Sequence, residues 1–580
     1  MFQVLTDTEV SKTMRYAVDP RQKALFDPAE MMFSPMAIKH MRSDWPGLFR
    51  TQLLHLMPVG KLADNFDPTV GCPTKELYSM AGAIFLKEFF NLTIDEAVRR
   101  YLTDGGWHFA LNLIPTEVSI SHATIERYMA LFAKNDIAGE IFHRVTSSFI
   151  EALELDVSRQ RLDSTHLFSD MATFGRSKLM GVTIKRFLTQ LKRHHRAAYD
   201  ALADELRSRY APSQAKMFGD FTGGRKQLRQ TVAEDLLLLV NRFAEDKAVA
   251  NRVSYKAMAR VLEEQCDVSE QAVEVKDKTG GGVMQNPSDP DAAYDGHKGP
   301  GYQAQIAETC SESNDVQLIT AVDVEPADAQ DQDALAPMLD QLESQDRSPE
   351  TVYADTHYGS DANVVAAADR GVDLQSPVSG PSSETEGDLT VDDFVIDEES
   401  ETVVRCPNGC EPHSSVHDAD TGQTTTVMRS ADCAGCEFGS LCPVNKSGGR
   451  FVFRHTPARR RLAARRGEQA TDAFKENYAI RAGGESVNSG LKRKTGMGRV
   501  RTRGQPRVRM AVLLRCAGWN MFRELAALRK RGIRDFVAAA AAFRPTFSPW
   551  RSFKRLIRVL DKPLGSLLAK FSPMPTPKDV

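Results

Sequence analysis

Residues 301–324 have the sequence GYQAQIAETCSESNDVQLITAVDV, and this stretch decides the fold prediction. Two runs rich in apolar and β-branched residues flank the turn-forming segment SESND, which is the pattern of a β-hairpin. Further along, residues 328–343 have the apolar spacing of a helix, and TVYAD at 351–355 is a short apolar strand. Residues 360–371 predict a second helix, because it would begin with Ser and Asp and end at Gly. VDLQSPV at 372–378 predicts one more strand.

The stretch before the hairpin adds one strand and a long helical insertion. LDVSRQRLDSTHLF at 155–168 predicts a strand with Asp163 near its end, and residues from about 175 to 275 predict mainly helix. A strand, a hairpin and then alternating helices and strands indicate an α/β core with a mixed sheet. The right-handed crossover rule places the 351–355 strand inside that sheet, parallel to a neighbour.

Length and composition limit the class of protein. At 580 residues and 64.3 kDa the chain exceeds one hydrophobic core, and about four domains are expected. A hydrophobic fraction of 42% and a charged fraction of 26% exclude a fibrous or fully disordered protein. The sequence predicts no membrane span and no secretory signal, so a cytoplasmic protein is expected. Nine cysteines in that compartment argue for metal binding or core packing rather than disulfides.

The first 150 residues are predicted to be helical. Thr93 and Glu96 have the spacing of a capping box, and a later helix would begin near Ser121. The apolar face of that later helix would comprise four residues at helical spacing, namely Ile125, Tyr128, Met129 and Phe132. Short helices joined by tight turns suit a helix-turn-helix-like DNA-binding module, and the alternative is a helical packing domain.

The net charge of −3 hides an uneven distribution. Residues 383–402 carry many carboxylates and no Lys or Arg, whereas residues 450–509 hold about 17 Lys/Arg and about 4 Asp/Glu. RRRLAARR at 459–466 and, further upstream, KRFLTQLKRHHR at 185–196 would each suit contacts with DNA phosphates. Either cluster could equally be a solvated helix face.

Three acidic residues form the candidate catalytic set. Asp163 and Asp355 follow predicted strands, where α/β sheets present functional side chains, although a single aspartate there is more often a cap. Glu485 lies within YAIRAGGESVNSGLK at 478–492. On a helix its spacing would align it along one face with Tyr478, Arg481 and Lys492. Such a face could aim a carboxylate at a metal and hold phosphates with its cations; the alternative is a solvated face with an internal ion pair.

These segments resemble the bacterial insertion-sequence transposases of the Asp-Asp-Glu class, in the branch with a Tyr-Arg-Glu-Lys signature and a Cys-rich insertion. RLDSTHLF at 161–168 is similar to the strand of the first aspartate, and YADTHYGSDANV at 353–364 to the motif of the second. RMAVLLRCAGWNMFREL at 509–525 is similar to the closing helix. The signature matches residue for residue, and the resemblance covers about residues 70–525.

The resemblance implies a ribonuclease-H-like core that binds two Mg²⁺ or Mn²⁺ ions through Asp163, Asp355 and Glu485. Asp170, further along the chain, is the alternative first ligand. Carboxylate oxygens suit such hard ions. Two ions would cleave DNA at the ends of the element and let the freed 3′-hydroxyls attack target DNA.

The resemblance also implies the partners. Arg481 and Lys492 would hold phosphates near the cut, and Tyr478 would pack on the strand or hydrogen-bond to it. The partner is double-stranded DNA, comprising the terminal repeats and the target, and a homodimer is expected to hold two ends in a synaptic complex. The protein would then be associated with the nucleoid. Two alternatives are a metal-dependent DNA nuclease of the same fold and a catalytically silent DNA-binding protein.

Five cysteines lie close together in the sequence. Cys433 and Cys436 have the spacing of a thiolate pair on tetrahedral Zn²⁺. The resemblance selects four structural Zn²⁺ ligands, Cys406, Cys433, Cys436 and Cys442. Cys410 is then surplus, with His413 and His417 as further candidates, and the alternative is a cluster that binds no metal.

The predicted organisation follows from these assignments. An all-helical DNA-binding domain would precede an α/β, ribonuclease-H-like catalytic core that two insertions interrupt. The expected boundaries are 1–150 for the DNA-binding domain, 151–174 for the first core strand, 175–290 for the helical insertion, 291–380 for the core continued, 381–468 for the acidic linker and Cys-rich insertion, 469–528 for the core with the Glu-bearing helix, and 529–580 for a basic tail.

Overall fold

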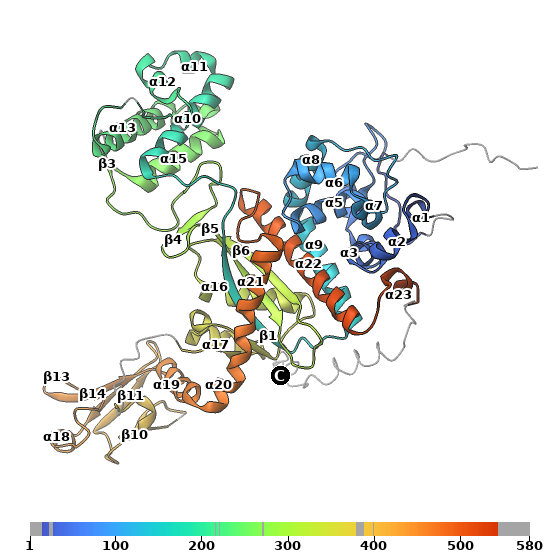
Figure 1. The fold of residues 1–580 in the computed structure, drawn as a ribbon. Helices are drawn as coiled ribbons and strands as arrows, with labels where there is room; N and C mark the ends of the chain where they lie inside the picture. The colour runs from blue at the N-terminus through green and yellow to red at the C-terminus, as the bar shows by residue number, and fades with distance from the viewer. Residues whose placement is uncertain are drawn as a thin grey trace, which may run out of the picture.

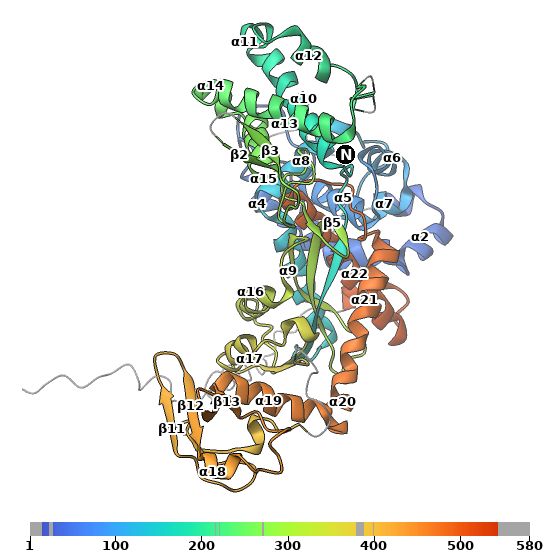
Figure 2. The same cartoon turned by 90° about the vertical axis from the view of Figure 1, so that its left-hand side faces the viewer.

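The computed structural model describes residues 14–22, 27–214, 216–219, 221–269, 272–378, 388–397 and 399–542. A central mixed sheet lies between a helical insertion and a small β-rich region, with the N-terminal helices packed beside it (Figures 1 and 2). No helix in these ranges is long and apolar enough to cross a membrane. The predicted mixed α/β architecture is confirmed.

The central sheet is built around the predicted hairpin. Its strand order is β4–β5–β1–β7–β8, and β6 also pairs with β5. β1, β7 and β8 are parallel, whereas β5 is antiparallel to both β1 and β6. The strands are β1 (Arg159–Leu167), β4 (Ala293–Asp295), β5 (Gly299–Thr309), β6 (Ile319–Pro326), β7 (Thr351–Tyr353) and β8 (Asp373–Gln375).

Two crossover helices connect the parallel strands, as expected. α16 (Asp331–Ser344) leads from β6 to β7, and α17 (Asp361–Ala368) leads from β7 to β8. The Ser360 hydroxyl caps α17 by accepting from the Asn363 amide over 3.2 Å. The apolar side of α16 packs with β-strand residues in one buried cluster. Local patterning therefore predicted this half of the sheet correctly.

The position of Asp163 within β1 differs from the prediction. We expected Asp163 near the end of its strand, but β1 continues to Leu167 because β5 pairs with it from Gln160 to Leu167. The parallel neighbour β7 pairs only with Arg159–Arg161. Asp163 therefore lies in the middle of β1, just past the end of its shorter neighbour and level with the loop that carries Asp355.

The described residues among the first 150 are mainly helical, as predicted. The capping box of Thr93 and Glu96 and the Ser121 cap are both present, and the four residues expected on the apolar face of α8 are buried. The helices are α1 (Pro28–Met32), α2 (Pro35–Arg42), α3 (Trp45–Leu48), the π-helical turn η1 (Phe49–Leu53), the 3₁₀ turn η2 (Leu54–Leu56), α4 (Val59–Ala63), α5 (Leu77–Phe89), α6 (Ile94–Thr103), α7 (Gly105–Ala110), α8 (His122–Lys134) and α9 (Ile137–Leu153).

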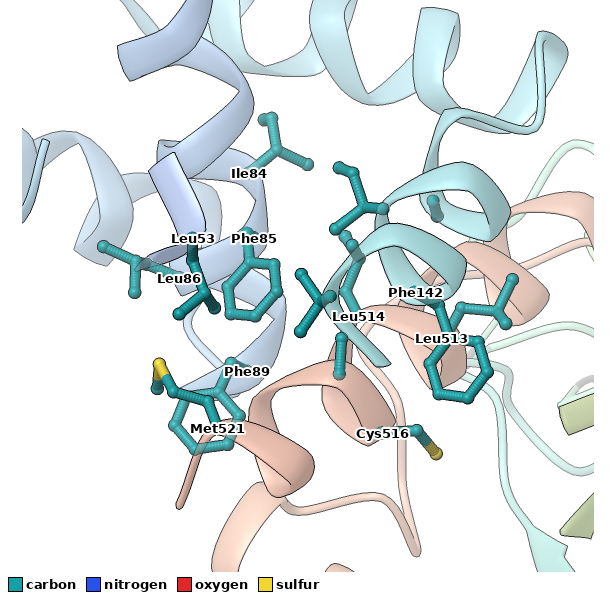
Figure 3. Close-up of a cluster of buried hydrophobic side chains, with 14 of the residues drawn as sticks. Leu53, Ile84, Phe85, Leu86, Phe89, Phe142, Leu513, Leu514, Cys516 and Met521 are labelled. Atoms are coloured by element: carbon teal, nitrogen blue, oxygen red, sulfur yellow. The ribbon is translucent and has the colours of Figure 1, made fainter. Parts of the chain in front are cut away.

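The long helix α22 (Gln505–Lys530) joins these N-terminal helices to the sheet. It contacts α5, α8 and α9 on the N-terminal side and β6 on the sheet side. In Figure 3, Leu513, Leu514 and Met521 of α22 lie among apolar side chains of α5 and α9. The N-terminal helices and the sheet therefore share one hydrophobic core.

The helical insertion has a core of its own. It comprises α10 (Arg176–His194), α11 (Arg196–Asp200), α12 (Asp204–Tyr210), α13 (Arg225–Phe243), α14 (Lys247–Ala250) and α15 (Val253–Gln265). The prediction of helix as far as residue 275 is wrong at its end. A small antiparallel hairpin follows α15, made of β2 (Cys266–Val268) and β3 (Val273–Val275), because β3 packs against α13.

The Cys-rich region is built mainly of small antiparallel sheets. It contains a 3₁₀ turn η4 (Val391–Asp393), β9 (Val395–Ile396), β10 (Val403–Arg405), β11 (Ser414–Asp418), β12 (Gln423–Met428), α18 (Ser430–Cys433), β13 (Asn445–Ser447) and β14 (Arg450–His455). α19 (Pro457–Ala470) leads back to the core. In the predicted tail, α23 (Phe536–Ala542) is described, and residues 543–580 lie outside the described part, as does most of the start of the acidic linker.

Candidate active site

The segment with the candidate glutamate is a broken helix rather than one regular face. α20 (Asp472–Tyr478) passes into a 3₁₀ turn, η5 (Ala479–Ala482), and then into α21 (Gly483–Thr495). The single-helix prediction is therefore wrong. Gly483 at the start of α21 allows its close approach to β1, because a Cβ there would collide with the Arg161 guanidinium, whereas a Cβ on Gly484 would lie at an ordinary contact distance of 3.5 Å from Asp163.

The structure brings the three candidate acids together around one guanidinium. Arg481 Nη2 lies 3.3 Å from Asp163 Oδ1 and 3.9 Å from Asp355 Oδ2, and Arg481 Nη1 lies 3.2 Å from Glu485 Oε1. The acids come from β1, from the loop after β7 and from α21. The sequence therefore identified the residues that meet, although it did not predict that Arg481 would lie between them.

Burial and charge determine the ionisation of this site. Burial raises the pKa of Asp163, with the carboxylates of Asp355 and Glu485 adding to the rise and Arg481 opposing it. Burial would lower the pKa of Arg481, but the surrounding acids outweigh it and the pKa is raised. Asn488 also donates to Asp163 Oδ2 over 3.1 Å. Glu485 is different, because 70% of its side chain is exposed. It is the acid most able to change position.

A fourth acid lies beside this site. Asp331, in the first turn of α16, accepts from Ser164 Oγ over 3.1 Å and from Gln305 Nε2 over 2.9 Å. Candidate ligand atoms of Asp331, Asp355 and His357 all lie within 4.8 Å of one another. In the described ranges, neither Asp163 nor Glu485 belongs to a set of three candidate ligands whose atoms all lie within 4.8 Å of one another. We attribute that to Arg481, which holds oxygens of both.

Sequence reasoning missed Asp331. The available signal was its place in the first turn of the helix that follows the hairpin, a position where acids also stabilise the helix dipole. The oxygen-rich donor set suits a hard divalent ion such as Mg²⁺ or Mn²⁺. Asp355 has a second task, because its Oδ1 accepts from the His357 amide over 2.9 Å and so caps the 3₁₀ turn η3 (Thr356–Tyr358).

The other signature residues differ in their surroundings. The Tyr478 hydroxyl donates to the Ala354 carbonyl over 2.9 Å, and its ring stacks on Phe474. Tyr478 therefore fastens the broken helix next to Asp355. Lys492 is exposed near the end of α21. Asp170, the alternative first ligand, instead pairs with Arg503 over 3.0 Å and does not join the acids around Arg481.

The arginine cluster at 459–466 is largely used within the protein. Arg460 pairs with Glu401 and Arg461 with Asp361, each over 2.8 Å. Arg465 donates to the carbonyls of Gly359 and Ser376. These contacts fasten α19 to the sheet and to the Cys-rich region, so three arginines of this cluster already have partners within the protein. In the upstream cluster, Lys185 likewise donates to three backbone carbonyls at 210–212.

The five clustered cysteines line one small pocket, together with Leu389, Pro407, Met428, Phe438 and other side chains. Burial raises the pKa of Cys433 to about 11 and also raises the pKa of Cys442, and neighbouring thiols add to both shifts. In the described part of the chain, no three of the thiol sulfurs all lie within 4.8 Å of one another. Neither His413 nor His417 lines the pocket, and His417 Nδ1 instead contacts Thr424 Oγ1.

A mixed sheet with carboxylates gathered beside its central strand is consistent with an α/β nuclease-like core. Residues 405–525 match the family described as the transposase DDE domain, and the matched segment contains Glu485 and most of α22 but neither aspartate. This match supports a transposase of the DDE type, a kind of enzyme that acts on DNA. No curated protein and no solved structure matches the chain.

Proposed function

We propose that the protein is a DNA transposase that cleaves the ends of an insertion element and transfers the 3′-hydroxyl ends to target DNA. The observation that carries this proposal is the meeting of Asp163, Asp355 and Glu485 around Arg481. The match of residues 405–525 to the DDE transposase family supports it independently. We further propose that the sheet is a ribonuclease-H-like core, because β1 lies between an antiparallel hairpin and two parallel strands joined by helices.

We propose that the site binds a pair of divalent cations. Asp163, Asp355 and Glu485 would hold Mg²⁺ or Mn²⁺, and Asp331 is close enough to Asp355 to contribute an oxygen. Several carboxylates near a single guanidinium leave an excess of negative charge, which a cation would balance. When bound, such ions activate an attacking oxygen and stabilise the leaving oxygen of an in-line displacement.

The chain's own residues would position the DNA. Tyr478 fixes the broken helix beside Asp355 through the Ala354 carbonyl. Once a cation takes the carboxylate oxygens, Arg481 would be released to bind a phosphate, for which a planar guanidinium is well suited. Lys492 would bind a phosphate further along α21. Glu485, being largely exposed, would turn inward to complete the ligand set.

We also propose a structural Zn²⁺ site in the Cys-rich region, formed by Cys406, Cys433, Cys436 and Cys442. The support is their common pocket, whose walls are otherwise largely apolar. Deprotonation on binding Zn²⁺ would have to overcome the raised thiol pKa values. The functional form would be a homodimer that holds two DNA ends, in the bacterial cytoplasm at the nucleoid.

A cleavage assay tests the catalytic proposal. The substrate is a labelled fragment carrying the element's own ends, incubated with Mg²⁺ and wild type, Glu485→Gln or Glu476→Gln. Glu476 is an exposed acid on the preceding helix and serves as the matched control. Wild type and the control should cut, and Glu485→Gln should lose at least about 10³-fold in rate, because a metal ligand is lost.

The products separate the alternatives. Joined products with added target DNA indicate a transposase, whereas cutting without joining indicates a nuclease of the same fold. If the wild type binds DNA as tightly as Glu485→Gln and neither cuts, the protein is a DNA-binding protein without catalysis. Equal cutting by wild type and Glu485→Gln would remove Glu485 from the active site.

A further inference from the structure

Three segments meet at the carboxyl end of β1, a few residues past Asp163. The Phe168 amide donates to the Gly498 carbonyl over 3.0 Å, and the Val500 amide donates to the Phe168 carbonyl over 2.9 Å. The turn between β4 and β5 reaches the same place, because a Cβ on Gly299 would lie 3.7 Å from the Phe168 ring. The strand end, the turn and the loop after α21 therefore form one surface.

Each segment contributes one basic side chain to this surface. His166 lies on β1, Lys298 in the β4–β5 turn and Lys492 on α21. A Cβ on Gly498 would lie 3.5 Å from Lys492 Cγ, so the lysine stem runs along the loop that pairs with the strand end. The surface thus collects three nitrogen-bearing side chains from segments far apart in the sequence.

Among the described residues, these side chains have no partners for their polar atoms. Neither Lys298 nor Lys492 has a carboxylate within 4.0 Å in the described part of the chain. Both ring nitrogens of His166 are buried, and within the described residues neither has a hydrogen-bond partner. Unpaired buried nitrogens are uncommon in folded proteins, and each one invites an explanation. The nearby Asp295 is already used, because it accepts from the amides of His297 and Lys298.

The charges also act on one another. Partial burial lowers the pKa of Lys492, although the residue is exposed overall, and the charge of Lys298 lowers it further. Burial lowers the pKa of His166, and both lysines add to that effect. The charge of Lys298 thus disfavours the ammonium form of Lys492, and an anion bound between their segments would offset this repulsion and accept hydrogen bonds from the basic side chains.

We propose that Lys298, Lys492 and His166 form a phosphate-binding subsite that holds a backbone phosphate of a DNA strand beside Asp163. This proposal rests on the proposed function and deepens it, because it defines where the substrate strand passes. The subsite continues into an exposed basic stretch of Arg493, Lys494 and Arg499. A polyanion such as DNA matches that continuity, whereas an isolated phosphate would use the first three residues alone.

The test is DNA binding in Ca²⁺, which supports binding without requiring turnover. The probe is a fluorescein-labelled 30-base-pair duplex of random sequence, and the readout is anisotropy at several salt concentrations. Lys298→Ala and Lys492→Ala should each weaken binding about three- to tenfold and reduce the slope of log K against log salt by about one. The DNA affinity of the double variant should fall by less than the product of the two single-variant factors, because both lysines contact one phosphate.

The control is Lys247→Ala, an exposed lysine on α14 of the helical insertion. It should leave both the affinity and the salt slope unchanged. Lys298→Arg should retain the wild-type slope of log K against log salt. That result would show that the loss in Lys298→Ala comes from the missing charge and not from a change in the conformation of the turn. If Lys298→Ala behaves like Lys247→Ala while the wild type binds and cleaves DNA, the subsite is wrong and the proposed function stands. If the wild type neither binds nor cleaves DNA, the phosphate-binding subsite and the proposed function are both wrong.

Discussion

At the scale of single residues, Arg481 is the most informative side chain. Its guanidinium contacts three carboxylates that the sequence had marked as metal ligands. An arginine in that place stabilises the acids when no cation is bound, because it balances charges that would otherwise repel one another. The same arginine must therefore compete with a divalent cation for the carboxylate oxygens.

This competition predicts that Arg481→Ala binds Mn²⁺ more tightly than wild type does in the absence of DNA. Removing the guanidinium increases the negative charge that the ion experiences, and a gain of about tenfold would correspond to about 1.4 kcal/mol. Titration calorimetry with Mn²⁺ measures the change. Arg493→Ala on the adjoining helix α21 is the matched control, because no acid contacts Arg493 in the described residues. Unchanged or weaker binding by Arg481→Ala would contradict the competition.

The residue scale also shows where sequence reasoning succeeded. The spacing of Arg481 and Glu485 identified two residues that do meet, because positions four apart are neighbours on a helical turn. Asp331 escaped notice because its proximity to Asp355 depends on the packing of α16 against the sheet. The pairing of Arg461 with Asp361 was not predicted for a similar reason, since the two residues lie 100 positions apart.

At the scale of secondary-structure elements, local patterns predicted most of the sheet and its crossovers. Alternation, turn residues and caps are short-range properties, and they identified β5, β6, α16 and α17. The end of β1 was not predictable in this way, because it depends on the length of its partner β5. The break between α20 and α21 likewise lies where the chain contacts β1, and a Cβ on Gly483 would collide there with Arg161.

The buried residue Glu524 on α22 allows a stability test, and the buried residue Glu88 on α5 provides the contrast. Glu524 is fully buried, and burial raises its pKa well above 4.5. The folded protein then keeps a proton that the unfolded chain releases as the pH rises, so this residue lowers stability increasingly above pH 4.5. Glu524→Gln should therefore raise the melting temperature at pH 8 and change it much less at pH 5.

The contrasting variant is Glu88→Gln on α5. Glu88 pairs with Lys87 over 2.6 Å and with Arg515 of α22 over 3.5 Å, and all three side chains are buried. Removing that carboxylate leaves two buried cations without their partner, which should cost about 3–5 kcal/mol. Melting curves of both variants from pH 5 to pH 8 test these two predictions. A melting temperature of Glu524→Gln at or below wild type at pH 8 would contradict the assignment.

At the scale of the whole molecule, the Cys-rich region is a separate small unit connected to the sheet by α19 (Figure 2). Its buried apolar cluster is small, and units of that size usually need a metal or disulfides. We expect one Zn²⁺ per chain by elemental analysis. Cys433→Ser should lose the metal and unfold this region, whereas Cys410→Ser should keep it. Equal zinc contents in the two variants would contradict the assignment of ligands.

The core shared through α22 has a consequence for synthesis on the ribosome. The partners of α5 and α9 on α22 emerge only after the roughly 350 residues between Leu153 and Gln505 have been made. At about 5–20 residues per second, that interval lasts on the order of tens of seconds. The nascent N-terminal helices spend it with apolar surface uncovered, so the first part of the chain to appear is among the last to finish folding.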